Sequence, residues 1–213
     1  MVPSRSFSKL LKMGLGRLFR LKYYASSGLK YNISEKDRHF SYVVIEAQNL
    51  WSNFSRSYLL SCLLRPKRIS KGFVVLSNAA ITTPGDLLLL ATRIHRGRTA
   101  AAPTTRREEP PWHDRNIFLR TCNELGCSHY SDILSAMSIQ TRVLEDIPVF
   151  RNFYAHRNEE STRKAIDLGR HKYLITGASH PTEVLASPPY KRTQPLILDW
   201  LDDMQVIIEF LCD

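Results

Sequence analysis

The sequence predicts an all-α fold, a helical bundle of about five or six helices with a basic N-terminal arm and irregular insertions. Two long segments, residues 38–64 and 195–213, have apolar side chains at steps of three and four residues, the spacing of one helix face. The short apolar run from Phe73 to Leu76 has no convincing strand partner nearby. We therefore expect that run to be irregular or helical.

Residues 1–34 form the basic arm in this prediction, and residues 35–213 form a single helical domain. The arm contains seven Lys and Arg residues and no Asp or Glu. The leucines between its basic residues are compatible with a basic amphipathic helix, and the lack of acids also suits an organelle transit peptide. Three interpretations stay open: an arm that grips nucleic acid, a helix on a membrane surface, and a solvated, partly ordered start.

The segment 38–64 gives the strongest helix signal. A broad apolar stripe predicts its core face, formed by Phe40, Val43, Val44, Ala47, Leu50, Trp51, Phe54, Tyr58 and Cys62. A polar stripe follows another face at the same steps, formed by Glu46, Asn49, Asn53 and Arg56. Because asparagine is mildly unfavourable inside a helix, this stripe is a candidate substrate-binding wall. A stripe that simply faces solvent is the alternative.

The middle of the chain alternates turns and shorter helices. A turn leads into a helix expected over 87–95. Residues 96–111 combine Pro, Thr, Ala and charge without an apolar period, which predicts an exposed loop. Two further helices are expected, one over 112–124 that Gly126 caps and one over 133–139.

The second half of the chain is organised around one helix expected over 146–168, with Asp146 as its cap and Pro148 in its first turn. One stripe of this helix is predicted to face the core, formed by Phe150, Tyr154, Ser161, Ala165 and Leu168. After Gly169, prolines predict an irregular stretch. A last amphipathic helix is expected from Pro195 onward.

The charge balance favours polyanionic partners. Lys and Arg number 30 against 20 Asp and Glu, which gives a net charge of +10 and a pI near 9.6 and suits RNA, DNA or an anionic membrane surface. The longest unbroken apolar run, Leu87 to Ala91, is too short for a transmembrane segment, and basic residues interrupt any secretion signal at the N-terminus. We expect a cytoplasmic protein whose cysteines are reduced.

Sequence patterns argue against several enzyme classes. The chain has no phosphate-binding G-x4-G-K-[ST] loop, no G-x-G-x-x-G, no G-x-S-x-G and no H-E-x-x-H motif. Cys122, Cys127 and His129, with His113 upstream, lack the tight C-x2-C spacing of zinc sites, so no metal or other cofactor is expected. Acidic residues do not cluster as a two-magnesium nuclease requires.

The candidate active site lies in the heptapeptide from Arg151 to Arg157, near the start of the expected helix. Asn152 and His156 are four residues apart, so on a helix they lie one above the other, and the long side chain of Arg151 can reach the same place. Arginine grips a phosphate through two N–H groups, and histidine transfers protons near neutral pH. This set of side chains suits phosphodiester chemistry.

The heptapeptide resembles the R-x4-6-H motif of the HEPN superfamily, in which a polar residue can follow the arginine. The resemblance covers roughly residues 38–213 and implies an all-α, metal-independent endoribonuclease. It also implies a homodimer with a composite active site, and it is compatible with a role as a toxin or anti-phage defence effector and with an antitoxin or sensor protein as partner. Asn158 stands where one branch of the superfamily has a tyrosine that a partner nucleotidyltransferase modifies, so regulation of that kind is not expected.

In the mechanism that the resemblance implies, the 2′-OH of RNA attacks the neighbouring phosphate. His156 acts as general base or acid, Arg151 stabilises the charge on the phosphorane, and Asn152 holds the phosphate or the imidazole. The polar stripe that begins at Glu46 faces this site, and Arg157 holds the RNA backbone. The competing hypothesis is a non-catalytic helical module that binds RNA or a protein partner.

Overall fold

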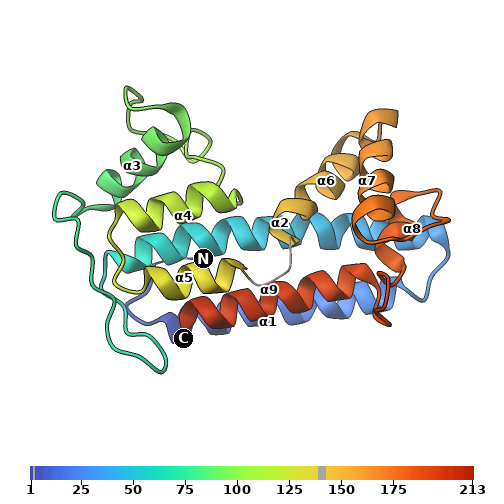
Figure 1. Cartoon of the computed structure of the whole chain (residues 1–213), viewed down its shortest axis with the longest axis horizontal. Coiled ribbons are helices and arrows are strands. Elements are labelled where there is room, and N and C mark those ends of the chain that lie inside the picture. Colours follow the sequence, from blue (N-terminus) through green and yellow to red (C-terminus); the bar gives the residue numbers. More distant parts are fainter. Residues whose placement is uncertain (2, 139–142) are drawn as a thin grey trace. The chain divides into compact units, whose positions relative to one another are not determined.

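The computed structural model describes residues 1, 3–138 and 143–213, and it is helical without strands in those residues. The helices are α1 (Phe7–Gly28), α2 (Ile33–Cys62), α3 (Pro84–Arg96), α4 (Arg115–Glu124), α5 (Tyr130–Ser138), α6 (Val143–His156), α7 (Glu159–Lys172), α8 (Pro181–Ala186) and α9 (Leu196–Cys212) (Figure 1). The all-α prediction is confirmed. The described residues contain more helices than expected, because residues 7–28 and the short α8 are helical and the expected central helix is divided.

The chain forms two compact units, each built from separate stretches of sequence. Unit 1 comprises Met1–Leu15, Leu50–Gln140 and Val206–Asp213, and unit 2 comprises Gly16–Asn49 and Thr141–Gln205. Helices α1, α2 and α9 contribute residues to both units. The division expected at residue 34 coincides with none of these boundaries.

Aromatic rings fill the core of unit 1. Phe7 and Tyr58 stack with their ring centroids 4.6 Å apart. Phe118 lies 5.7 Å from Tyr58 and 5.8 Å from Trp51, and all four side chains are buried. Such ring pairs contribute about 0.5–1.5 kcal/mol each beyond the burial of their area. The stripe predicted for the strongest helix is therefore a core face, as Trp51 and Tyr58 show.

Residues 7–28, expected to belong to a basic arm, instead form a packed helix. In unit 2, Leu18 and Leu21 of α1 are buried, and Lys22 forms an ion pair with Asp202 of α9, with Nζ and Oδ1 2.5 Å apart. Burying the leucines removes apolar surface from water and outweighs the cost of ordering the helix. The basic amphipathic helix that the leucines allowed is therefore present, and Leu18 and Leu21 belong to its core face in unit 2.

The starts of the shorter helices follow local capping rules. Thr83 caps α3 and forms a capping box with Asp86: the hydroxyl of Thr83 accepts from the Asp86 N–H, and the Asp86 carboxylate accepts from the Thr83 N–H. Pro84 stands in the first turn, where its missing N–H leaves no bond unmade. The expected turn and the helix after it are thus confirmed. Gly126 follows α4 with φ of 63°, in the left-handed region that suits glycine.

The helix expected over 146–168 is divided into α6 and α7. Its backbone leaves the helix at Arg157, whose φ is 47°, and Asn158 then caps α7 by accepting a hydrogen bond of 2.8 Å from the N–H of Ser161. Asp146 lies inside α6 rather than capping it, and Pro148 is also inside the helix. The predicted core stripe is largely buried nevertheless, because α7 folds back against α6 (Figure 1).

The remaining segments are irregular. The loop 96–111 is mostly exposed, as expected, and the Phe73 to Leu76 run forms isolated bridges at its two ends rather than a strand. The C-terminal end of the helix expected over 133–139 lies outside the described residues. Among residues 1, 3–138 and 143–213, no helix combines the length and apolar character that crossing a bilayer requires.

Candidate functional site

The candidate catalytic residues lie in the C-terminal half of α6, in unit 2. Arg151, Asn152 and His156 are all exposed, and His156 is the last residue of the helix. The expectation that they lie near a helix start is wrong, because α6 begins at Val143. The positive N-terminal end of the α6 dipole is therefore not available to a phosphate bound at these side chains.

Helical geometry brings two of the three residues together. Asn152 and His156 are separated by one turn of α6, so their side chains leave the helix in nearly the same direction. Arg151 and His156 are about 140° apart around the helix axis at 100° per residue. Of the three, Arg151 depends most on the length of its side chain to reach a shared substrate.

Arg157, the last residue of the heptapeptide, is held by other helices of unit 2. Its Nη1 donates to Oδ2 of Asp37 over 2.7 Å, and its guanidinium lies 5.7 Å from the ring centroid of Tyr154. The other carboxylate oxygen of Asp37 accepts a 2.7 Å hydrogen bond from Thr182, whose hydroxyl oxygen is 3.0 Å from the hydroxyl of Tyr154. This cluster joins α2, α6 and α8. Arg157 thus has a structural partner, and its predicted contact with RNA stays a prediction.

Tyr154 faces the core, as its position in the stripe predicts. Its side chain is buried, and burial raises its pKa well above the ordinary value. The phenol therefore stays protonated and keeps its hydrogen bond with Thr182. Tyr154 anchors the helix that bears the candidate residues and does not reach the exposed face.

A second, part-buried cluster joins α6 to α7 and α9. The carboxylate of Asp146 is 6% exposed and accepts hydrogen bonds from the ammonium group of Lys172 and from the hydroxyl of Tyr173. The Tyr173 hydroxyl in turn accepts a 2.8 Å hydrogen bond from Nε1 of Trp200. Burial and the negative charge of Asp146 raise the pKa of Tyr173. The position of α6 is thus set by two polar clusters, one near each end.

The polar stripe of α2 is divided between the two units. In unit 2, Glu46 accepts from Arg17 over 3.1 Å and from Asn49 over 3.0 Å. In unit 1, Arg56 grips Glu109 through two hydrogen bonds of 2.6 and 2.7 Å. Arg106 of the loop 96–111 also donates to Asn53 over 3.2 Å. The four residues therefore do not form one wall within one unit, and their role in binding substrate stays a prediction.

The cysteines and a buried histidine lie together in unit 1 but away from solvent. The four cysteines are free and buried. The neighbouring side chains of Cys122 and Cys62 lower the pKa of Cys127, and burial lowers the pKa of His129, whose Nε2 is 2.5 Å from the Tyr58 hydroxyl. In the part of the chain that the structure describes, no group of three or more His, Cys, Asp or Glu side chains is arranged to hold a metal ion. A substrate cannot reach these groups without opening the core.

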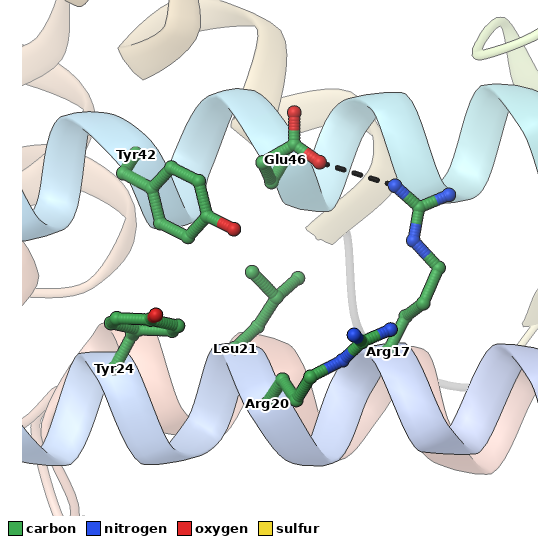
Figure 2. A pocket seen from close by; sticks show the side chains of 6 residues that line it. All are labelled: Arg17, Arg20, Leu21, Tyr24, Tyr42 and Glu46. Atoms are coloured by element: carbon green, nitrogen blue, oxygen red, sulfur yellow. Dashed lines mark hydrogen bonds and ion pairs between the residues drawn. The ribbon is translucent and has the colours of Figure 1, made fainter.

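A further concave surface, which sequence reasoning missed, lies in unit 2 between α1 and α2 (Figure 2). It is lined by Arg17, Arg20, Leu21, Tyr24, Tyr42 and Glu46. The signal that would have found it is the set of tyrosines interleaved with basic residues over 17–42.

Comparison with known proteins leaves the family open. No protein-family model, no curated protein and no solved structure matches this chain. The resemblance to the HEPN superfamily accordingly has the heptapeptide and the all-α fold as its only support.

Proposed function

We propose that this protein is a metal-independent endoribonuclease similar to HEPN enzymes, with Arg151, Asn152 and His156 as its catalytic residues. The observation that carries the proposal is the exposure of all three side chains on the last turns of α6. Two clusters, around Asp146 and around Asp37, hold that helix in place. A rigid helix that presents an arginine, an amide and an imidazole to solvent suits RNA cleavage by proton transfer and charge stabilisation.

The proposed reaction is an internal transesterification. His156 takes the proton from the 2′-OH, and the 2′-oxygen attacks the adjacent phosphorus. The bond from phosphorus to the 5′-oxygen then breaks, and that oxygen takes a proton from a general acid. The products are a 2′,3′-cyclic phosphate and a 5′-OH end. Arg151 stabilises the charge on the phosphorane oxygens, and Asn152 holds the phosphate or fixes the imidazole tautomer.

A homodimer completes the proposed site. The reaction needs a base and an acid, whereas the heptapeptide has a single imidazole, at His156. Two copies that face each other across α6 supply two imidazoles, and they also place the arginine of one copy beside the imidazole of the other. That arrangement overcomes the angle of about 140° between Arg151 and His156 on one helix. An antitoxin or sensor protein that restrains a toxin or defence effector would act by covering this face.

The test uses purified protein, total RNA and EDTA. We expect cleavage that leaves 2′,3′-cyclic phosphate ends, and we expect His156→Ala to lower the rate by about 10²–10⁴-fold. His171→Ala is the matched control, since His171 is an exposed histidine of the neighbouring helix α7, and it keeps full activity. Cleavage that needs a divalent metal, or that persists unchanged in His156→Ala, contradicts the proposal.

The second candidate function is a helical module that binds RNA without cleaving it. The observation that favours it is the exposed basic and aromatic surface of α1 and α2 in unit 2, which does not involve the heptapeptide. Binding without cleavage by both the wild type and His156→Ala supports this candidate over the enzyme.

A further inference from the structure

Exposed aromatic rings gather on the hairpin that α1 and α2 form in unit 2. Five rings between residues 19 and 42 are more than two-fifths exposed: Phe19 74%, Tyr23 67%, Tyr24 42%, Tyr31 45% and Tyr42 49%. Leaving large rings in water is unfavourable, and several of them in one region indicate a binding surface. Basic residues separate them along the sequence, among them Arg20, Lys30 and Arg38.

Two adjoining hollows lie on this hairpin and share a pair of tyrosines. The first, of about 220 Å³, has Arg17 and Arg20 at one end and Tyr24 and Tyr42 at the other (Figure 2). The second, of about 370 Å³, is lined by the same two tyrosines together with Arg38 and His39. We call these two hollows together the tyrosine–arginine groove.

The charges of the groove leave it basic. Glu46 neutralises Arg17, to which it is bonded over 3.1 Å, and so holds that guanidinium in place. Arg20 and Arg38 are exposed and have no ion-pair partner in the part of the chain that the structure describes. An anionic group that enters either hollow therefore meets a cation that no carboxylate has neutralised.

The geometry of the rings determines how a base can stack. The centroids of Tyr24 and Tyr42 are 5.2 Å apart and their planes are at 66°, so no base fits between them. A base can instead stack on the outer face of either ring. Tyr31 and His39 stack on each other at 5.0 Å with planes at 25°, and His39 also lines the second hollow. Successive flat groups with a regular negative charge therefore match the groove better than a single small anion does.

We propose that the tyrosine–arginine groove binds single-stranded RNA, with bases stacked on Tyr24 and Tyr42 and phosphates at Arg20 and Arg38. The carboxylate of Glu46, which lines the first hollow, accepts a hydrogen bond from a ribose 2′-OH and disfavours DNA. The tyrosine hydroxyls suit a wet surface better than a lipid interior, which favours a nucleic acid over a membrane. The choice of RNA rests on the proposed function, whereas the groove itself does not involve the heptapeptide.

The experiment measures binding of the full chain to a fluorescent single-stranded oligouridine in EDTA, with His156→Ala as the background so that the probe is not cut. We expect Tyr24→Ala with Tyr42→Ala to weaken binding by about tenfold or more, and Tyr42→Phe to retain it, since a phenyl ring still stacks. Arg20→Ala lowers the slope of log affinity against log salt by about one. Tyr190→Ala and Arg163→Ala are the matched controls, because both side chains are exposed in unit 2 outside the groove.

Each outcome of this experiment supports or overturns the proposal that the groove binds single-stranded RNA. Thermal unfolding curves that match the wild type show that the Tyr24→Ala, Tyr42→Ala chain is folded. If that double variant does not fold, Tyr42→Phe still tests the proposal, because loss of RNA binding with the ring retained contradicts stacking. Unchanged affinity in the folded double variant overturns the proposal, and so does equal binding of DNA and RNA or preferential binding of anionic phosphatidylserine vesicles. Loss of cleavage without loss of binding in His156→Ala supports both proposals. Cleavage that persists in His156→Ala removes the proposed active site and leaves the groove standing.

Discussion

His129 and His156 occupy opposite environments in the two units. His129 lies in the core of unit 1, with the Tyr58 hydroxyl 2.5 Å from its Nε2, whereas His156 lies in solvent at the end of α6 in unit 2. The buried histidine has the strongly bonded neighbours that an active site often shows, yet a substrate cannot reach it. The exposed histidine is open to solvent, so a substrate can reach it. Accessibility, and not only chemical neighbourhood, separates a structural histidine from a candidate catalyst.

The same contrast holds for the carboxylates of unit 2. Asp146 is 6% exposed and accepts hydrogen bonds from Lys172 and Tyr173, whereas Asp37 is 14% exposed and pairs with Arg157, whose side chain is 49% exposed. Buried polar groups cost far more to disrupt than exposed ones, because an orphaned partner cannot turn to water. The loss of stability in each variant therefore distinguishes polar groups that stabilise the fold from those that are available to bind a substrate.

The largest effect is expected from Asp146→Ala. Removing the carboxylate leaves the ammonium group of Lys172 and the hydroxyl of Tyr173 without their acceptor, which lowers the free energy of unfolding by about 3 kcal/mol. Urea denaturation monitored by Trp fluorescence measures the change, since Trp200 donates to Tyr173. Glu159→Ala, at an exposed position of the neighbouring helix α7, is the comparison. Equal stability of the two variants would show that Asp146 does not hold α6.

The second largest effect is expected from Tyr58→Phe, which lowers the free energy of unfolding by about 1–3 kcal/mol. The change keeps the stacked ring but removes the hydroxyl that bonds to Nε2 of His129 in a buried site. Tyr190→Phe, at an exposed tyrosine, leaves stability unchanged. Chemical denaturation of the three proteins at pH 7 measures the difference, and a Tyr58→Phe chain as stable as the wild type contradicts a structural role for the pair.

The pH dependence of stability isolates His129. Burial lowers its pKa, so below the ordinary value of about 6.5 the unfolded chain binds a proton that the folded chain does not. The free energy of unfolding therefore falls as pH falls from about 6.5 towards the lower pKa of the folded state, by up to about 1.4 kcal/mol per pH unit.

Comparison with His129→Gln removes the contribution of groups that do not interact with His129 to this slope. Asp203 in unit 2 has its pKa raised to about 6 by burial and acts in the opposite direction, but it is present in both proteins and cancels in the difference. We expect wild type to lose more stability than His129→Gln between pH 7 and pH 5. Parallel curves for wild type and His129→Gln would contradict the burial of His129.

The smallest effect is expected from Arg157→Ala. Its own side chain is 49% exposed, so water and salt screen the pair with Asp37, and Thr182 still donates to that carboxylate; we expect a loss of less than about 1 kcal/mol. If Arg157 only stabilises the end of α6 through Asp37, the salt dependence of RNA binding is the same in Arg157→Ala as in the wild type. A slope of log affinity against log salt that falls by about one assigns Arg157 to the RNA backbone instead.

Much of the fold was predictable because apolar periodicity reports burial directly. The α2 stripe from Phe40 to Cys62 and the α9 stripe from Ile197 to Leu211 are buried almost throughout. The division of the central helix was missed, although its signal was present: Asn158 followed by Glu159 and Glu160 is a helix start, with a cap and an acidic first turn. The stripe from Phe150 to Ala165 fits a continuous helix and a tight helical hairpin equally well, so periodicity could not distinguish them.

The candidate site was only partly predictable. The heptapeptide identifies residue types and their spacing, and the exposure of Arg151 and His156 agrees with a role in binding substrate. The pairing of Arg157 with Asp37 was not predictable, because the two residues are 120 positions apart and only the fold brings them together. The tyrosine–arginine groove depends in the same way on the approach of Tyr24 and Tyr42 from two helices.

The positions of the four thiols allow the opening of the unit 1 core to be measured by cysteine alkylation. Every cysteine of the chain lies in that unit, and each is buried, so an alkylating reagent can modify them only when the core opens. The rate of alkylation, followed by intact mass, measures the opening of unit 1 without any introduced label. Unit 2 contains no thiol and therefore does not contribute to the measured alkylation.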